Sequence, residues 1–174
     1  EKQPAPITQK LNCEKFILKL LNEYCERNKK KLVLALKANR SDKKINRLNE
    51  VKYYENLLGK KFVKPKINSY KVVNNSELSV CLSSSLGLEM ISRSSKVFFL
   101  PFLSKFSKKL ICYYTPSNKS LIFIHSKFEK NAITKKIEKL ISLKKKQWEN
   151  NLNKFNKKII FDRKNKILND LCHS

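Results

Sequence analysis

The chain has 174 residues, with 39 Lys and Arg against 14 Asp and Glu, which gives a formal net charge of +25. Hydrophobic residues make up 41% of the sequence, which excludes a disordered polar tail and indicates a folded core. Such an excess of positive charge opposes compaction unless a polyanion neutralises it, so we expect a partner that carries phosphate groups.

The first half of the sequence predicts two helices and a basic connector. The first helix is capped by Thr8 and runs towards Asn28, because apolar residues recur at helical spacing: Cys13, Phe16, Ile17, Leu20 and Tyr24. Residues 32–36 form a short strand or further helix, and periodicity does not decide between them. The second helix begins after Ser41-Asp42 and ends near Gly59. Residues 60–66 form the connector.

The second half predicts a small sheet followed by a long helix. Asn74-Asn75-Ser76 joins the first two strands as a turn, and Pro101 favours an edge position for the third. The expected strands are residues 70–73, 78–82, 97–103, 110–114 and 121–124. The helix carries one apolar stripe: Ile133, Ile137, Leu140, Ile141, Trp148, Leu152 and Phe155. Residues 159–161 predict a last strand and residues 163–171 a terminal helix.

These elements predict an α+β fold. A small, mostly antiparallel sheet with a long covering helix occupies the second half, and the first half is rich in helix. We expect three parts: a helical region at residues 1–62, a sheet-plus-helix domain at residues 67–147 and a basic extension at residues 148–174.

Catalytic and metal-binding patterns are missing from the sequence. The chain has five cysteines, Cys13, Cys25, Cys81, Cys112 and Cys172. No two of them form a Cys-x-x-Cys pair, the spacing typical of zinc sites. The two histidines, His125 and His173, do not suggest a nucleophile–base pair, and two glycines cannot build a phosphate-cradling loop. We therefore expect no enzyme, no metal, no cofactor and no small-molecule substrate. The longest apolar stretch, residues 97–103, is too short to span a membrane.

Clusters of lysine form the candidate binding site. They recur along the chain with little acidic compensation, and an ammonium group contacts phosphate as a point charge. The expected RNA-binding residues are Lys29, Lys30, Lys31, Lys43, Lys44, Lys60, Lys61, Lys127, Lys130, Lys135, Lys136, Lys139, Lys144, Lys145, Lys146, Lys157, Lys158 and Arg163.

The order of elements from Tyr70 to Lys144 resembles the C-terminal domain of ribosomal protein six of the large subunit, in its bacterial and organellar form. The matching segments are Tyr70-Lys71, alternating Leu78, Val80 and Leu82 with Leu86-Gly87 downstream, Phe99-Leu100-Pro101, Leu110 to Pro116, and Leu121 to Ser126 followed by Glu129-Lys130. Lys127 stands where the family usually has a turn glycine. The family's Gly-rich segment after the helix is absent.

This resemblance implies a structural ribosomal protein of the large subunit that takes part in translation. Its partners would be ribosomal RNA and neighbouring ribosomal proteins. Abundant Lys and Asn with scarce Gly and Arg is typical of an AT-rich genome, so we expect a mitochondrial ribosome in the matrix, with a plastid as the other organelle. The alternatives are a lineage-specific mitoribosomal or RNA-processing subunit of another fold, a peripheral subunit of an inner-membrane complex, and a nuclear DNA-binding protein.

Overall fold

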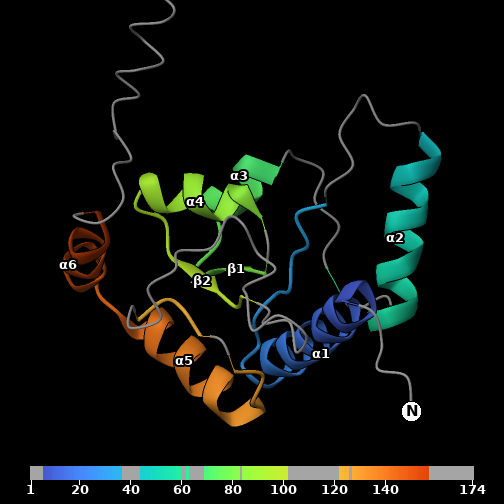
Figure 1. The fold of residues 1–174 in the computed structure, drawn as a ribbon, viewed down its shortest axis with the longest axis horizontal. Coiled ribbons are helices and arrows are strands. Elements are labelled where there is room, and N and C mark those ends of the chain that lie inside the picture. Colours follow the sequence, from blue (N-terminus) through green and yellow to red (C-terminus); the bar gives the residue numbers. More distant parts are fainter. Residues whose placement is uncertain are drawn as a thin grey trace, which may run out of the picture.

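The computed structural model describes residues 6–36, 44–59, 62, 69–82, 84–101, 122–125 and 127–156. Its elements follow one another as α1 (Pro6–Arg27), α2 (Lys44–Leu58), α3 (Ser69–Asn74), β1 (Ser79–Cys81), α4 (Ser85–Ser92), β2 (Val97–Phe99), α5 (Lys130–Ser142) and α6 (Lys145–Asn156). Figure 1 shows the short strands between α4 on one side and α5 on the other. The fold is α+β, as predicted, with helix predominating.

The sheet is parallel, so the predicted antiparallel pairing is wrong. Ser79 pairs with Val97, and Cys81 pairs with Phe99. A further parallel bridge joins Phe99 to Ile124. The strands are parallel because the helix α4 connects them. α4 brings the chain back to the edge of the sheet where β1 began, whereas two antiparallel strands can be joined by a tight turn. β2 ends at Phe99, so Pro101, which was expected within this strand, lies beyond its end.

Gly87 allows α4 to lie close against these strands. A Cβ atom on Gly87 would lie 2.8 Å from Cε1 of Phe99 and 2.9 Å from Sγ of Cys81. Real Cβ atoms do not approach other atoms so closely, so a larger residue would push α4 away from the sheet. Leu86-Gly87, which the resemblance matched downstream of the strand at 78–82, is part of this helix.

The apolar stripe predicted for the long helix is confirmed at five positions, while Ile141 is half-buried and the side chain of Phe155 lies outside the described residues. Ile133, Ile137 and Leu140 are buried on α5, and Trp148 and Leu152 are buried on α6. The helix is not continuous, however, because Leu143 adopts an extended conformation between α5 and α6. The side-chain oxygen of Gln147 accepts a hydrogen bond from the Lys144 backbone N–H and so begins α6. The chain turns at this point, and both helices contribute to the same core.

That core also includes residues from the first helix. Ile17, Leu20, Leu21 and Tyr24 of α1 belong to one buried cluster with the sheet, α4, α5 and α6. A smaller cluster of Leu18, Leu58 and Phe62 joins α1 to α2. The division into three parts stays a prediction.

Several local predictions differ from the structure. Residues 70–73, expected as a strand, belong to the helix α3, and α1 begins at Pro6 rather than after Thr8. β2 covers Val97–Phe99 only. Residues 32–36 form no helix. α2 ends at Leu58, and the following Gly59 has a φ of +66°, the left-handed helix terminus expected there.

Other predictions lie outside the described residues. They are the Ser41-Asp42 cap, most of the connector at 60–66, the strand at 110–114, and the elements at 159–161 and 163–171.

Candidate anion-binding surface

The predicted lysines fall into three groups in the structure. Some stabilise the fold, others project into solvent, and the remainder lie outside the described residues. The last group comprises Lys43, Lys60, Lys61, Lys157, Lys158 and Arg163, and the side chain of Lys44 belongs with them.

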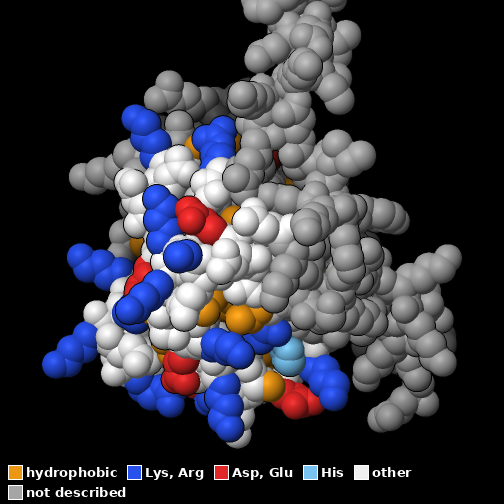
Figure 2. Space-filling view, turned by 90° about the vertical axis from the view of Figure 1, so that its left-hand side faces the viewer, with side chains coloured by type: hydrophobic (Ala, Val, Ile, Leu, Met, Phe, Trp, Pro, Cys, Tyr) orange, Lys and Arg blue, Asp and Glu red, His pale blue; other side chains and the backbone are white. Residues whose placement is uncertain are grey.

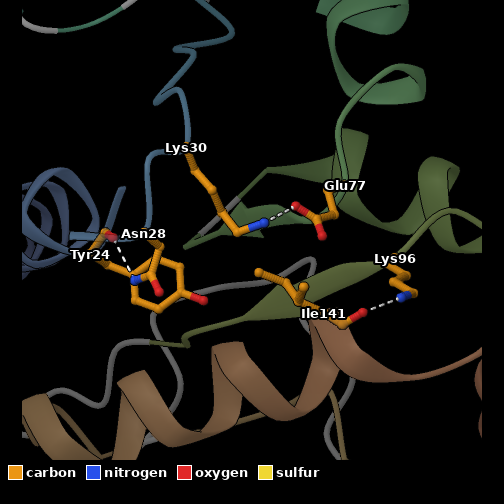
Figure 3. A network of polar contacts seen from close by, with 6 residues as sticks. All are labelled: Tyr24, Asn28, Lys30, Glu77, Lys96 and Ile141. Carbon is orange, nitrogen blue, oxygen red and sulfur yellow. Dashed lines mark hydrogen bonds and ion pairs between the residues drawn. The ribbon is translucent and has the colours of Figure 1, made fainter. Parts of the chain in front are cut away.

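Three predicted lysines contact the protein itself. Lys30, which follows α1, forms an ion pair with Glu77 at 2.5 Å, as Figure 3 shows. Lys130 at the start of α5 pairs with Glu23 of α1 at 2.6 Å. The ammonium of Lys136 donates to the carbonyl oxygen of Ile124 at 2.9 Å, and burial lowers its pKa. These lysines hold separate segments together, so they are less available to a partner than the sequence suggested.

The other described lysines of the prediction are exposed: Lys29, Lys31, Lys127, Lys135, Lys139, Lys144, Lys145 and Lys146. Figure 2 shows Lys and Arg side chains spread over one face of the molecule, with fewer acidic side chains among them. The structure therefore presents a basic surface made from several elements rather than a single pocket.

The densest exposed group is the lysine corner, which we define as Lys144, Lys145 and Lys146 at the start of α6. The first turn of this helix contains no acidic residue. Among the described residues, no carboxylate lies within ion-pair distance of these three ammonium groups. Because the N-terminal end of a helix carries partial positive charge, the three cations stand where a helix favours anions. The lysine corner is therefore a concentration of uncompensated positive charge.

Two contacts hold the lysine corner in place. The indole Nε1–H of Trp148 donates to the carbonyl oxygen of Ser94 at 2.9 Å. The ammonium of Lys96 donates to the carbonyl oxygens of Ile141 at 2.8 Å and Leu143 at 2.7 Å, and Figure 3 shows the first of these bonds. Lys96 thus caps the C-terminal end of α5 next to the corner. Lys96 is not among the predicted residues, because an isolated lysine before a strand carries no distinctive signal in the sequence.

His125 lies between the Ile124 bridge and α5, in the strand-to-helix turn where it was predicted. Its backbone N–H donates to the carbonyl oxygen of Phe99 at 3.0 Å. Its Nε2 atom is buried without a hydrogen-bond partner among the described residues. Burial, and then the neighbouring ammonium of Lys136, hold the pKa of His125 below its usual value. No described nucleophile reaches Nε2, so this geometry offers no general-base pair.

Other site types find little support in the described part of the chain. A shallow hollow of about 230 Å³ between α1 and α2 is lined by Lys19, Asn22, Glu23, Glu26, Leu57 and Leu58, and its two carboxylates oppose anion binding. The described residues include no cluster of three metal-binding side chains. No helix among them combines the length and the apolar character needed to cross a bilayer.

Comparison with known proteins identifies the family. A family model described as "putative O-antigen biosynthesis protein" matches residues 8–174, so the chain belongs to that family. No curated protein and no solved structure matches it.

This membership overturns the ribosomal interpretation. The match covers nearly the whole chain, whereas the resemblance to ribosomal protein six was an order of short elements. That order does not hold in three dimensions either, because the first expected strand is the helix α3, the helix α4 lies between the next two, and those strands are parallel. The predicted role in the large ribosomal subunit and in translation is therefore wrong, and so is the predicted mitochondrial location.

Proposed function

We propose that this protein takes part in O-antigen biosynthesis as a non-catalytic, basic binding protein that holds a phosphate-bearing partner. The process comes from the description of its family, which matches residues 8–174. The binding role comes from the chain itself, and its single strongest support is the net charge of +25 that the sequence carries.

The lysines of the chain differ in how far the fold engages them. Some lysines are engaged in the fold, such as Lys30, Lys130 and Lys136, but the lysine corner has no acidic compensation among the described residues. Ammonium groups on flexible stems suit phosphate contacts that do not depend on one ligand geometry. A phosphate-bearing partner would relieve the mutual repulsion of these charges.

The non-catalytic role rests on the chemistry of the described side chains. The buried Nε2 of His125 has no described partner, and the hollow between α1 and α2 contains no histidine. A binding role needs neither a nucleophile nor a base, and it uses the one feature that the chain has in excess.

Disruption of the gene in its own organism tests the biosynthetic role. We expect less O-antigen, or shorter chains, on electrophoresis of the cell-surface polysaccharide, and recovery when the wild-type gene is returned. The binding role predicts recovery also by His125→Gln, because no step of chemistry depends on that imidazole. Unchanged O-antigen after disruption would remove the protein from the process.

A further inference from the structure

We propose that the lysine corner, Lys144, Lys145 and Lys146, is the surface through which this protein docks on an anionic lipid bilayer. This inference rests on the proposed function in one respect, that the partner carries phosphate groups. It adds the place of contact and the class of partner.

The lysine corner has an energetic cost for the isolated protein. Three consecutive cations stand at the positive end of α6, whose first turn contains no acidic residue. Glu149 lies within one turn of Lys145 and Lys146, but it forms no ion pair with either of them. Like charges so placed lower the stability of a helix. Local rules of this kind are broken most often where a surface serves a function.

Hydrogen bonds on both sides of the lysine corner hold its backbone in place. Trp148 is 2% exposed, and its indole N–H bonds to Ser94, so the first turn of α6 is fixed to the turn that precedes β2. Lys96 binds the last carbonyl groups of α5 just before the corner. The backbone that carries the three lysines is therefore held by contacts beneath it, while their side chains remain exposed.

The side chains around the lysine corner favour a bilayer over RNA as the partner. Single-stranded RNA is recognised largely by stacking of its bases on aromatic side chains. The one aromatic residue at the corner, Trp148, is buried and its N–H is engaged. The exposed large hydrophobic side chains of the described residues lie elsewhere: Leu11, Phe16, Val33 and Tyr70. The corner thus offers charge alone, which suits a plane of phosphate headgroups that several flexible ammonium groups reach together.

The decisive experiment is co-sedimentation with vesicles of phosphatidylcholine, with and without phosphatidylglycerol. The test variant is the triple substitution Lys144→Gln, Lys145→Gln and Lys146→Gln. The hydrogen bonds of this turn use the backbone of Lys144 and the side chain of Gln147, so the substitutions leave them intact. The matched control changes three other exposed lysines, Lys15→Gln, Lys31→Gln and Lys52→Gln, which removes the same total charge.

We expect wild-type protein to bind only the vesicles that contain phosphatidylglycerol. The triple variant of the corner should lose roughly 100-fold in partition coefficient, and the control should lose much less. A triple Lys→Arg variant at the same positions should bind like wild type. An equal loss in the control would show that the corner has no special part, and that outcome would overturn the inference.

Binding to inorganic polyphosphate, measured with the same variants, separates the two proposals. Protein that binds polyphosphate but neither kind of vesicle retains the proposed function and refutes the bilayer as partner. Preference for structured RNA over vesicles, abolished by the corner variant, also refutes the bilayer. Protein that binds neither polyphosphate nor vesicles refutes both proposals.

Discussion

The indole nitrogen of Trp148 and the carbonyl oxygen of Ser94 lie 2.9 Å apart and form a hydrogen bond across 54 residues of sequence. Trp148 also packs edge-on against Phe123, with ring centroids 5.5 Å apart. One side chain therefore joins α6 both to the turn before β2 and to the core beneath it.

Two substitutions of Trp148 separate the contribution of its hydrogen bond to stability from the contribution of its packing. Trp148→Phe keeps an aromatic ring but leaves the Ser94 carbonyl without its indole partner, and we expect a loss of about 1–3 kcal/mol in the free energy of unfolding. Trp148→Ala also removes the packing and should cost about 3–5 kcal/mol. Urea denaturation measures both values. Equal values for the two variants would contradict separate contributions from the bond and the ring.

Ile137 lies in the apolar stripe of α5 and is 2% exposed, so a charged substitution there should strongly lower the stability of the protein. Ile137→Lys places an unpaired ammonium in the core, so we expect loss of the cooperative thermal transition of the protein. Glu138→Lys, on the exposed side of the same helix, is the matched control and should melt almost like wild type. A normal melting curve for Ile137→Lys would reject the packing of α5 on the sheet.

The close approach of α4 to the sheet predicts a cost for a single added methyl group. In Gly87→Ala the new Cβ overlaps Phe99 and Cys81, and we expect a loss of about 1–3 kcal/mol in stability. If the overlap is the cause, Gly87→Ala combined with Phe99→Leu should cost less than the sum of the two single changes. Strict additivity in urea denaturation would point to a different cause.

His125 predicts how stability depends on pH. Burial first, and then Lys136 and Lys127, lower its pKa in the folded protein, while Glu129 partly opposes this shift. The unfolded chain therefore binds more protons once the pH falls below the ordinary histidine value of 6.5, and the folded state loses stability there. Above that value His125 is neutral in both states and contributes no pH dependence.

Urea midpoints measured between about pH 7.5 and 5.5 test this prediction. Wild type should lose stability towards the acid end, and His125→Gln should lose less. Parallel curves for the two proteins would show that His125 does not control this range.

The helices with a sustained apolar stripe were the most predictable part of the fold. Ile133, Ile137 and Leu140 were assigned to the core from their spacing alone, and Trp148 was correctly placed in the core. The break at Leu143 was missed because the apolar spacing continues across it, whereas the turn depends on backbone conformation and on Gln147.

The sheet was less predictable because its strands are short and their neighbours ambiguous. Residues 70–73 contain three apolar residues in four, a pattern that fits a strand or a helix equally well. Once they were taken as a strand, the turn at Asn74–Ser76 suggested a hairpin. The helix α4 after Ser84 went unnoticed, and the direction of the sheet was then predicted wrongly.

The candidate anion-binding surface was also predictable only in part. Charge and lysine clusters were visible in the sequence, but which lysines the fold engages was not. The partners of Lys30 and Lys130 lie 47 and 107 residues away, and such pairs depend on the tertiary arrangement.

The proposal that exposed lysines hold phosphate groups is tested most directly by the affinity of purified protein for inorganic polyphosphate, measured across a range of salt concentrations. If exposed lysines hold phosphate groups, the dissociation constant should rise steeply as salt increases, because each contact releases bound counterions. An affinity that stays almost constant from low to moderate salt would contradict the claim.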